Sequence, residues 1–246
     1  MLKSAIVSGC TALALLASVV FSVACEQPCP MKPGSPAATQ PGSAAKPTPA
    51  PTPAAPTPKP DQAGWTVAYT GDFSGAKLPP EWLILDGDAK VEGGKLVVFA
   101  EAESQAQVVL KNPTLDAPSI RVELTGSISG EKIGDFSFML NTSKSGIPDG
   151  YMLQFGGGGN TENRIRRDDG TIIDGSTTKD PLPQPDKKYT IVAENDKGHI
   201  RLIVDGKTVL DFKDPKPLSG ARNGQIGLYT WGSTLKIDKL VVSTKK

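Results

Sequence analysis

The chain has 246 residues and a formal net charge of +1, with 27 Lys and Arg against 26 Asp and Glu. This balance excludes a strongly basic surface, so we expect no nucleic-acid partner. All three cysteines lie early in the chain, at positions 10, 25 and 29. A cysteine metal site or a thiol nucleophile in the remaining residues is therefore excluded.

Residues 1–24 have the form of an export signal. Lys3 supplies the charged start, an apolar run covers Ala5–Val23, and small residues precede Cys25. The run is about long enough to span a membrane, so a membrane anchor is the alternative. Because the run also contains Ser, Thr and Gly, we predict a signal peptide over residues 1–24.

The end of this segment, Ser22-Val23-Ala24-Cys25, resembles the bacterial lipobox. The resemblance implies that Cys25 becomes the lipid-modified N-terminus, anchored to a membrane in the cell envelope. Glu26 follows where an Asp would imply retention at the inner membrane, so the expected location is the outer membrane or the cell surface. Ser22 departs from the usual Leu, which keeps ordinary secretory cleavage before Cys25 as an alternative.

Residues 25–63 form a linker rich in Pro, Ala and Thr. Such a segment has too few apolar groups to form a core, so we expect an extended spacer. Residues 64–246 contain 23 Lys and Arg against 24 Asp and Glu and are numerous enough for one buried core. We predict a single domain there and expect it to be a monomer.

Short stretches with period-two alternation, separated by Gly, Asp, Asn and Pro, run through this domain. No stretch shows apolar residues at helical spacing over three turns, so short strands are predicted throughout. Asp205-Gly206 joins two alternating runs and predicts a tight hairpin, because a type I′ turn needs positive φ at both positions. The clearest predicted strands are Lys95–Ala100, Ala106–Leu110, Ile120–Ser127, Asp135–Asn141, Tyr151–Phe155, Asn163–Asp168, Tyr189–Glu194, Ile200–Val204, Lys207–Phe212, Gln225–Trp231 and Leu235–Val242.

This pattern indicates an all-β fold, an antiparallel two-sheet jelly-roll sandwich of a dozen or so strands. Several motifs in the same order resemble the concanavalin A-like lectin/glucanase superfamily. They are Asp72-Phe73, Val91-Glu92-Gly93-Gly94, Gly134-Asp135-Phe136, Gly150-Tyr151-Met152-Leu153-Gln154-Phe155, Val204-Asp205-Gly206, Gly224-Gln225-Ile226-Gly227 and Ile237-Asp238. The nearest branch contains bacterial domains similar to 3-keto-disaccharide hydrolase and laminin-G-like modules. The resemblance implies that carbohydrate binds on the concave sheet.

The middle strands alternate between apolar residues and polar or aromatic residues that suit a sugar. Planar amides, guanidinium groups and an aromatic ring match directional hydroxyl groups and the C–H faces of a sugar ring. The alternative is a merely solvated sheet face, with Trp231 packed under a loop. The candidate ligand-binding residues are Asn141, Gln154, Arg164, Arg166, Tyr229 and Trp231.

The sequence favours no enzyme chemistry. The glucanases of the superfamily carry a Glu-x-Asp-x-x-Glu strand, and the nearest match, Glu194-Asn195-Asp196, is predicted at a turn and lacks the third carboxylate. His199 is the only histidine and has no accompanying nucleophile elbow. No cofactor is expected, although the resemblance implies one structural Ca²⁺ at Asp72 and Asp238, where the first and last strands meet.

Three functions follow from these observations. The first is an exported, lipid-anchored domain that binds a poly- or oligosaccharide. The second is a glycoside hydrolase of the 3-keto-disaccharide type, and the third is a non-catalytic structural lipoprotein of the envelope.

Overall fold

The computed structural model describes residues 64–143, 145, 149–167, 170–173 and 175–246. The predicted signal peptide (1–24) and linker (25–63), with Cys25, lie outside these residues. The described part forms two antiparallel sheets with fourteen strands in total. It contains no helix that is long and apolar enough to cross a membrane.

The larger sheet has eight strands. Seven of them form one path, in the order β12 (Lys207–Lys213), β11 (His199–Val204), β10 (Lys188–Asp196), β6 (Ser119–Ser129), β14 (Thr234–Lys245), β4 (Lys95–Phe99) and β3 (Asp88–Glu92). The eighth strand, β1 (Thr66–Gly71), pairs with β14 beyond the segment that β4 uses. The first and last strands of the domain therefore lie side by side.

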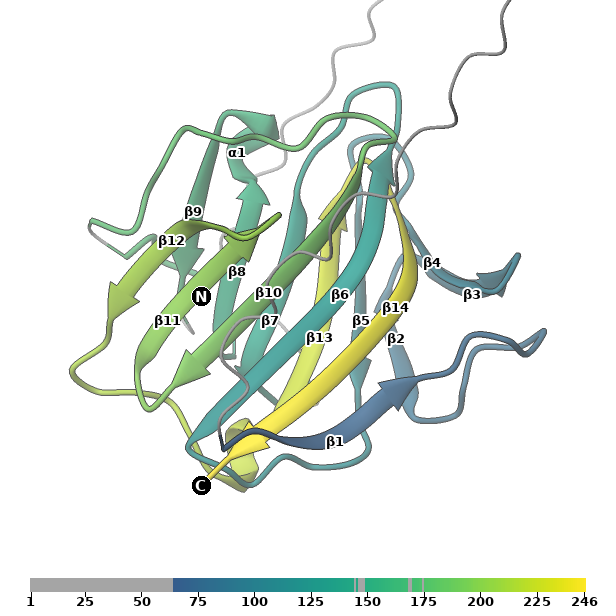
Figure 1. The fold of residues 1–246 in the computed structure, drawn as a ribbon. Helices are drawn as coiled ribbons and strands as arrows, with labels where there is room; N and C mark the ends of the chain where they lie inside the picture. The colour runs from purple at the N-terminus through teal and green to yellow at the C-terminus, as the bar shows by residue number, and fades with distance from the viewer. Residues whose placement is uncertain (1–63, 144, 146–148, 168–169, 174) are drawn as a thin grey trace, which may run out of the picture. The chain divides into compact units, whose positions relative to one another are not determined.

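The smaller sheet has six strands. Their order is β2 (Trp82–Asp86), β5 (Gln105–Leu110), β13 (Gln225–Trp231), β7 (Phe136–Thr142), β8 (Tyr151–Gly156) and β9 (Glu162–Arg166). Figure 1 shows β10, β6 and β14 of the larger sheet in front of β7, β13 and β5 of the smaller one. Two short helical segments lie in the connections, α1 (Gly157–Asn160) and η1 (Ala221–Asn223).

The predicted hairpin at Asp205-Gly206 is present between β11 and β12. Both residues have positive φ, 50° at Asp205 and 81° at Gly206, as a type I′ turn requires. Asp205 also fixes the neighbouring strand, because its Oδ1 accepts a hydrogen bond of 2.9 Å from the backbone N–H of Thr190.

One core fills the space between the sheets. Alternate residues of β6 and β7 point into it, among them Ile120, Val122, Phe136 and Phe138, each no more than 1% exposed. Burying one such side chain stabilises the fold by roughly 1.5–3 kcal/mol. Because no cysteine lies in residues 64–246, this core and the strand ladders hold the domain together. The predicted all-β, two-sheet sandwich is confirmed.

Candidate functional site

A row of polar side chains crosses the outer face of the six-stranded sheet. The residues are direct partners from one strand to the next, so they form one line perpendicular to the strands. In order across the sheet they are Asp86, Gln107, Tyr229, Ser137, Gln154 and Arg164. We call this line the polar row.

The strand alternation places the polar row away from the core. The neighbours of Ser137, Gln154 and Tyr229 along their strands belong to the core, for example Phe138 and Leu228. Successive side chains of a strand point to opposite faces, so the polar residues between them face outward. The sequence-predicted residues Gln154, Arg164 and Tyr229 are thus brought together on one face.

A hydrogen-bond chain centred on Asp135 orders one half of the row. Asp135 Oδ2 accepts hydrogen bonds from Ser137 Oγ at 2.5 Å and from Gln154 Nε2 at 2.6 Å. The other end of the Gln154 amide accepts from Arg164 Nε at 2.7 Å. Arg164 Nη1 in turn lies 3.2 Å from Glu162 Oε1. Asp135, Gln154 and Arg164 each have two partners in this chain, so this half of the row is preorganised.

Two groups of this network have raised pKa values. Asp135 is only 3% exposed, and its burial raises the pKa of the carboxyl even though Ser137 and Gln154 donate to it. Burial raises the pKa of Tyr229 to about 12, with a further contribution from the negative charge of Asp135. Tyr229 therefore keeps its proton at neutral pH and offers a hydroxyl that donates and accepts hydrogen bonds.

An apolar row runs beside the polar row, one step along the strands. It contains Leu83, Val109, Gly227, Met139 and Met152, and it ends at Arg166. Gly227 lies at the centre of this row and cannot be replaced by a larger residue, because a Cβ there would lie 2.3 Å from Met139 Cε and 2.5 Å from the Val108 carbonyl oxygen. The face therefore combines polar groups with an apolar strip whose side chains are closely packed, Val109, Met139 and Met152 being no more than 4% exposed.

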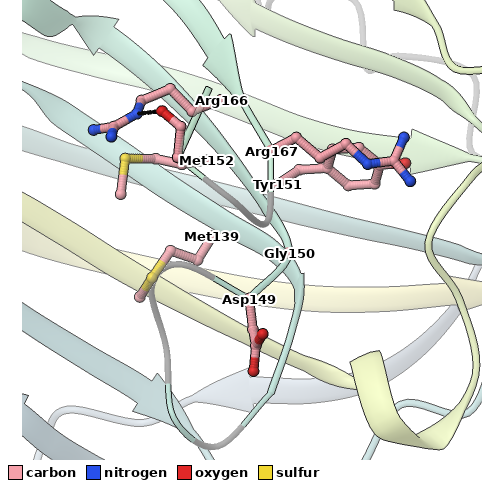
Figure 2. A pocket seen from close by; sticks show the side chains of 8 residues that line it. Met139, Asp149, Gly150, Tyr151, Met152, Arg166 and Arg167 are labelled. Carbon is pink, nitrogen blue, oxygen red and sulfur yellow. Dashed lines mark hydrogen bonds between the residues drawn. The ribbon is translucent and has the colours of Figure 1, made fainter. Parts of the chain in front are cut away.

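A small pocket lies at the Arg166 end of the apolar row (Figure 2). Met139 and Met152 line it, together with the loop residues Asp149, Gly150 and Gly170. Figure 2 shows Arg166 and the two methionines extending to one side, while Tyr151 and Arg167 extend to the other. Arg166 Nε donates to the Gly170 carbonyl oxygen at 2.8 Å, which holds the side chain over the pocket.

Trp231 stands at the end of β13 on the same face as Tyr229. Its side chain is 47% exposed and is not packed under a loop. The cross-strand partner of Trp231 is Gln105, whose Nε2 donates to Asp86 Oδ2 at 2.6 Å, at the outer end of the polar row. An exposed indole next to ordered polar groups is available for stacking on a ligand.

Asn141 does not join this face. The expected alternation places Asn141 outward with Ser137 and Met139, but its φ of 51° breaks the alternation at the end of β7. Its side chain turns inward and accepts a hydrogen bond of 2.8 Å from Asn195 Nδ2, on β10 of the larger sheet. Asn141 is fully buried and links the two sheets.

The glycine run beside β8, labelled α1, forms a tight turn in which Gly158 and Gly159 have left-handed φ values of 65° and 73°. A Cβ on Gly157 would lie 2.9 Å from Arg164 Nε, so the turn packs directly against the end of the polar row. Asn163, on β9, receives a hydrogen bond of 3.0 Å from the backbone N–H of Gly156 and faces inward.

Asp72 and Asp238, the two residues expected to bind Ca²⁺, each have other partners in the described part of the chain. The carboxylate of Asp238 contacts two ammonium groups, Lys95 Nζ at 2.6 Å and Lys188 Nζ at 2.9 Å, which lower its pKa. Asp72 is exposed and accepts a local hydrogen bond of 2.9 Å from the Ser74 backbone N–H. Within the described ranges, no three His, Cys, Asp or Glu side chains are placed to share a metal ion.

Glu194 and His199 lie on the outer face of the other sheet. Glu194 belongs to β10, not to a turn as expected, and its fully buried carboxylate is paired with Arg121 at 2.6 Å and with Arg201. His199 Nε2 lies 2.8 Å from Asp211 Oδ1 at the surface. Neither residue is near the polar row, because the whole core separates the two outer faces.

The sequence analysis did not select Asp135, Asp86 or Gln107 as site residues. Asp135 has the same strand parity as Ser137 and Met139, so extending the alternation by one step identifies it. Asp86 and Gln107 become neighbours of Tyr229 only through the strand order, which the alternation of single strands does not contain.

Comparisons with known proteins find the same two-sheet fold in several solved structures. A family model described as a domain of unknown function, DUF6250, matches residues 148–240. The Emp47p carbohydrate recognition domain is similar in structure, with a TM-score of 0.56 and 19% identity, covering 76% of this chain and 100% of that one. No curated protein matches the chain.

Two further solved structures have the same arrangement. The exoplasmic/lumenal domain of VIP36, solved with Ca²⁺ and Man3GlcNAc bound, has a TM-score of 0.54 and 10% identity over 68% of this chain and 84% of its own. A structure described with endo-acting O-glycanases of human gut microbiota has a TM-score of 0.53 and 12% identity over 74% and 100%. At these identities the likenesses show a shared fold.

Proposed function

We propose that the domain binds carbohydrate on the outer face of its six-stranded sheet. The observation that carries this proposal is the polar row, ordered around Asp135 and flanked by the exposed Trp231. Preorganised amide, hydroxyl and guanidinium groups match sugar hydroxyls, and the indole matches the C–H face of a pyranose ring. The carbohydrate recognition domain of Emp47p and the VIP36 domain with bound Man3GlcNAc share the fold, which supports the same assignment.

The rest of the proposed function concerns location. The lipobox-like Ser22–Cys25 supports export and lipid attachment at Cys25, and the Pro-rich residues 25–63 support a spacer between anchor and domain. The domain then belongs to the concanavalin A-like superfamily and acts as a monomer in the cell envelope.

A glycosidase of the 3-keto-disaccharide hydrolase type is the second candidate, and Asp135 is the observation that favours it. A buried carboxyl with a raised pKa is the form that a general acid takes in a glycosidase. Glu162 supplies a second carboxylate on the same face, paired with Arg164. Binding remains the first candidate, because Asp135 is enclosed by its two donors.

The test is a polysaccharide pull-down and glycan array with the full chain and its Trp231→Ala variant. Losing one stacked indole weakens binding roughly tenfold. Trp65→Ala is the matched control, because the Trp65 ring lies against Arg121 on the opposite sheet. Binding that is saturable, weakened by Trp231→Ala and retained by Trp65→Ala supports the proposal.

The same samples separate binding from hydrolysis. New reducing ends or shorter products that disappear in Asp135→Asn would establish the enzyme. No binding and no product with any glycan contradicts both and leaves a structural envelope protein.

A further inference from the structure

We infer that the site selects glycans with an acidic substituent, a carboxylate or a sulfate, and that Arg166 binds this group. The inference rests on the proposed function and adds the chemical class of the ligand. Three arginines in and just after β9, at positions 164, 166 and 167, carry the argument, because they differ in what already binds them.

Two of the three arginines are occupied. Arg164 donates to Gln154 and pairs with Glu162, as described above. Arg167 Nη1 pairs with Asp214, and its Nη2 donates to the Lys216 carbonyl oxygen at 2.8 Å. Both guanidinium groups therefore serve the fold or the row itself.

Arg166 is different. Its Nε is held by the Gly170 carbonyl oxygen at 2.8 Å, and in the part of the chain that the structure describes neither of its Nη atoms meets a carboxylate. The side chain is partly buried, which weakens solvent screening of its charge. An arginine fixed at Nε with two free Nη groups is arranged for a bidentate bond to a planar anion.

The surroundings place such an anion on a sugar that lies over the sheet. Arg166 is the cross-strand partner of Met152 and closes the apolar row, one step from the polar row. A sugar bound on this face beside the pocket can bring an acidic substituent to Arg166, whose side chain is partly exposed. Asp149 is the acidic residue that lines the pocket, and its Oδ2 accepts a hydrogen bond of 2.7 Å from Ser143 Oγ. Figure 2 shows the two methionines between Asp149 and Arg166.

Matched pairs of polymers test the inference on the full chain. Polygalacturonate is compared with its carboxyl-reduced form, and a sulfated galactan with its desulfated form, by calorimetry at low and high NaCl. We expect at least one acidic polymer to bind about 10- to 100-fold more tightly than its neutral partner, the range for a charge-assisted hydrogen bond. The preference should shrink in high salt.

Arg166→Gln should abolish this preference, so that the acidic and the neutral polymer of a pair bind the variant with equal affinity. The matched control is Lys236→Gln, which removes one positive charge from an exposed position on β14, on the outer face of the opposite sheet. That control should keep the preference. The polymer pair that shows the effect identifies the anion as carboxylate or sulfate.

Each other outcome has one meaning. Equal binding of acidic and neutral polymers overturns the inference and leaves the proposed function standing. A preference that survives in Arg166→Gln overturns the assignment to Arg166. Binding to none of the four polymers or the glycan array overturns the proposed function and the inference with it.

Discussion

Asp135 differs from the surface carboxylates of this protein in both burial and pKa. It is almost enclosed, and desolvation raises the pKa of its carboxyl against the effect of two donors. Asp238 shows the opposite case, because Lys95 and Lys188 favour its charged form and lower its pKa. The two residues therefore make opposite contributions to the pH dependence of stability.

The first prediction uses Asp135→Asn. Between the unfolded pKa near 4 and the raised folded pKa, the folded wild type binds more protons than the unfolded chain, so raising the pH lowers its free energy of unfolding. The Asn variant lacks this proton, and its Oδ1 can still accept from Ser137 and Gln154. Urea unfolding from pH 4 to 8 should show the wild type losing stability relative to Asp135→Asn as the pH rises.

Asp238→Asn is the control with the opposite sign. A lowered pKa contributes stability that is present above the unfolded pKa and is lost as the pH falls toward the folded pKa. The advantage of the wild type over Asp238→Asn should therefore shrink toward low pH. A stability difference between the wild type and Asp135→Asn that stays constant with pH contradicts the assignment of a raised pKa.

At the scale of elements, alternation predicted most strands well. Gln225–Trp231 matches β13, and Arg164 and Arg166 lie on one face of β9 opposite Ile165, as predicted. The alternation failed at Asn141, where a positive φ turns the side chain into the core. A period-two pattern cannot predict this inward turn of Asn141, because the turn depends on the hydrogen bond that Asn195 donates from the other sheet.

The polar row shows the same limit of prediction from the sequence alone. Tyr229 and Gln154 were recognised singly, but their adjacency depends on the order β5–β13–β7–β8–β9, which joins residues more than 70 positions apart. Asp135 was not selected from the sequence, because its raised pKa comes from burial and burial is a property of the assembled sheet.

The buried Arg121–Glu194–Arg201 group gives the prediction at this scale. Glu194 is fully buried between β6 and β11, so replacing it by Gln removes the buried carboxylate that lies 2.6 Å from Arg121, which is only 3% exposed. Breaking such a pair costs about 3 kcal/mol, less than the roughly 5–15 kcal/mol that stabilises a domain. Denaturant unfolding of Glu194→Gln should show this loss, while glycan binding at 25 °C is unchanged.

Glu123→Gln is the matched control on the same sheet. Glu123 lies 3.8 Å from Arg121 and its side chain is 24% exposed, so losing its charge should cost less than about 1 kcal/mol. Glycan binding or cleavage that disappears in folded Glu194→Gln would instead place a functional site on the eight-stranded sheet.

At the scale of the whole molecule, the two outer faces differ in the groups that they expose. On the larger sheet the central charges are paired and partly covered, with Trp65 against Arg121 and Lys245. On the smaller sheet, Trp231 is exposed, and among the described residues no carboxylate pairs with the Nη atoms of Arg166. We propose that the first face supports the fold and that the second meets the glycan, presented from a membrane by the N-terminal segment.

The anchor is the last prediction. If Cys25 carries acyl chains, each buried methylene contributes about 0.8 kcal/mol to membrane binding, so the protein should sediment with the envelope. In a bacterial host fed an alkyne-labelled fatty acid, the wild type and Cys29→Ser should be labelled and bound to membranes. Cys25→Ser should be unlabelled. An unlabelled wild type that is released to the soluble fraction with Cys25 as its first residue contradicts lipid attachment and establishes ordinary secretory cleavage.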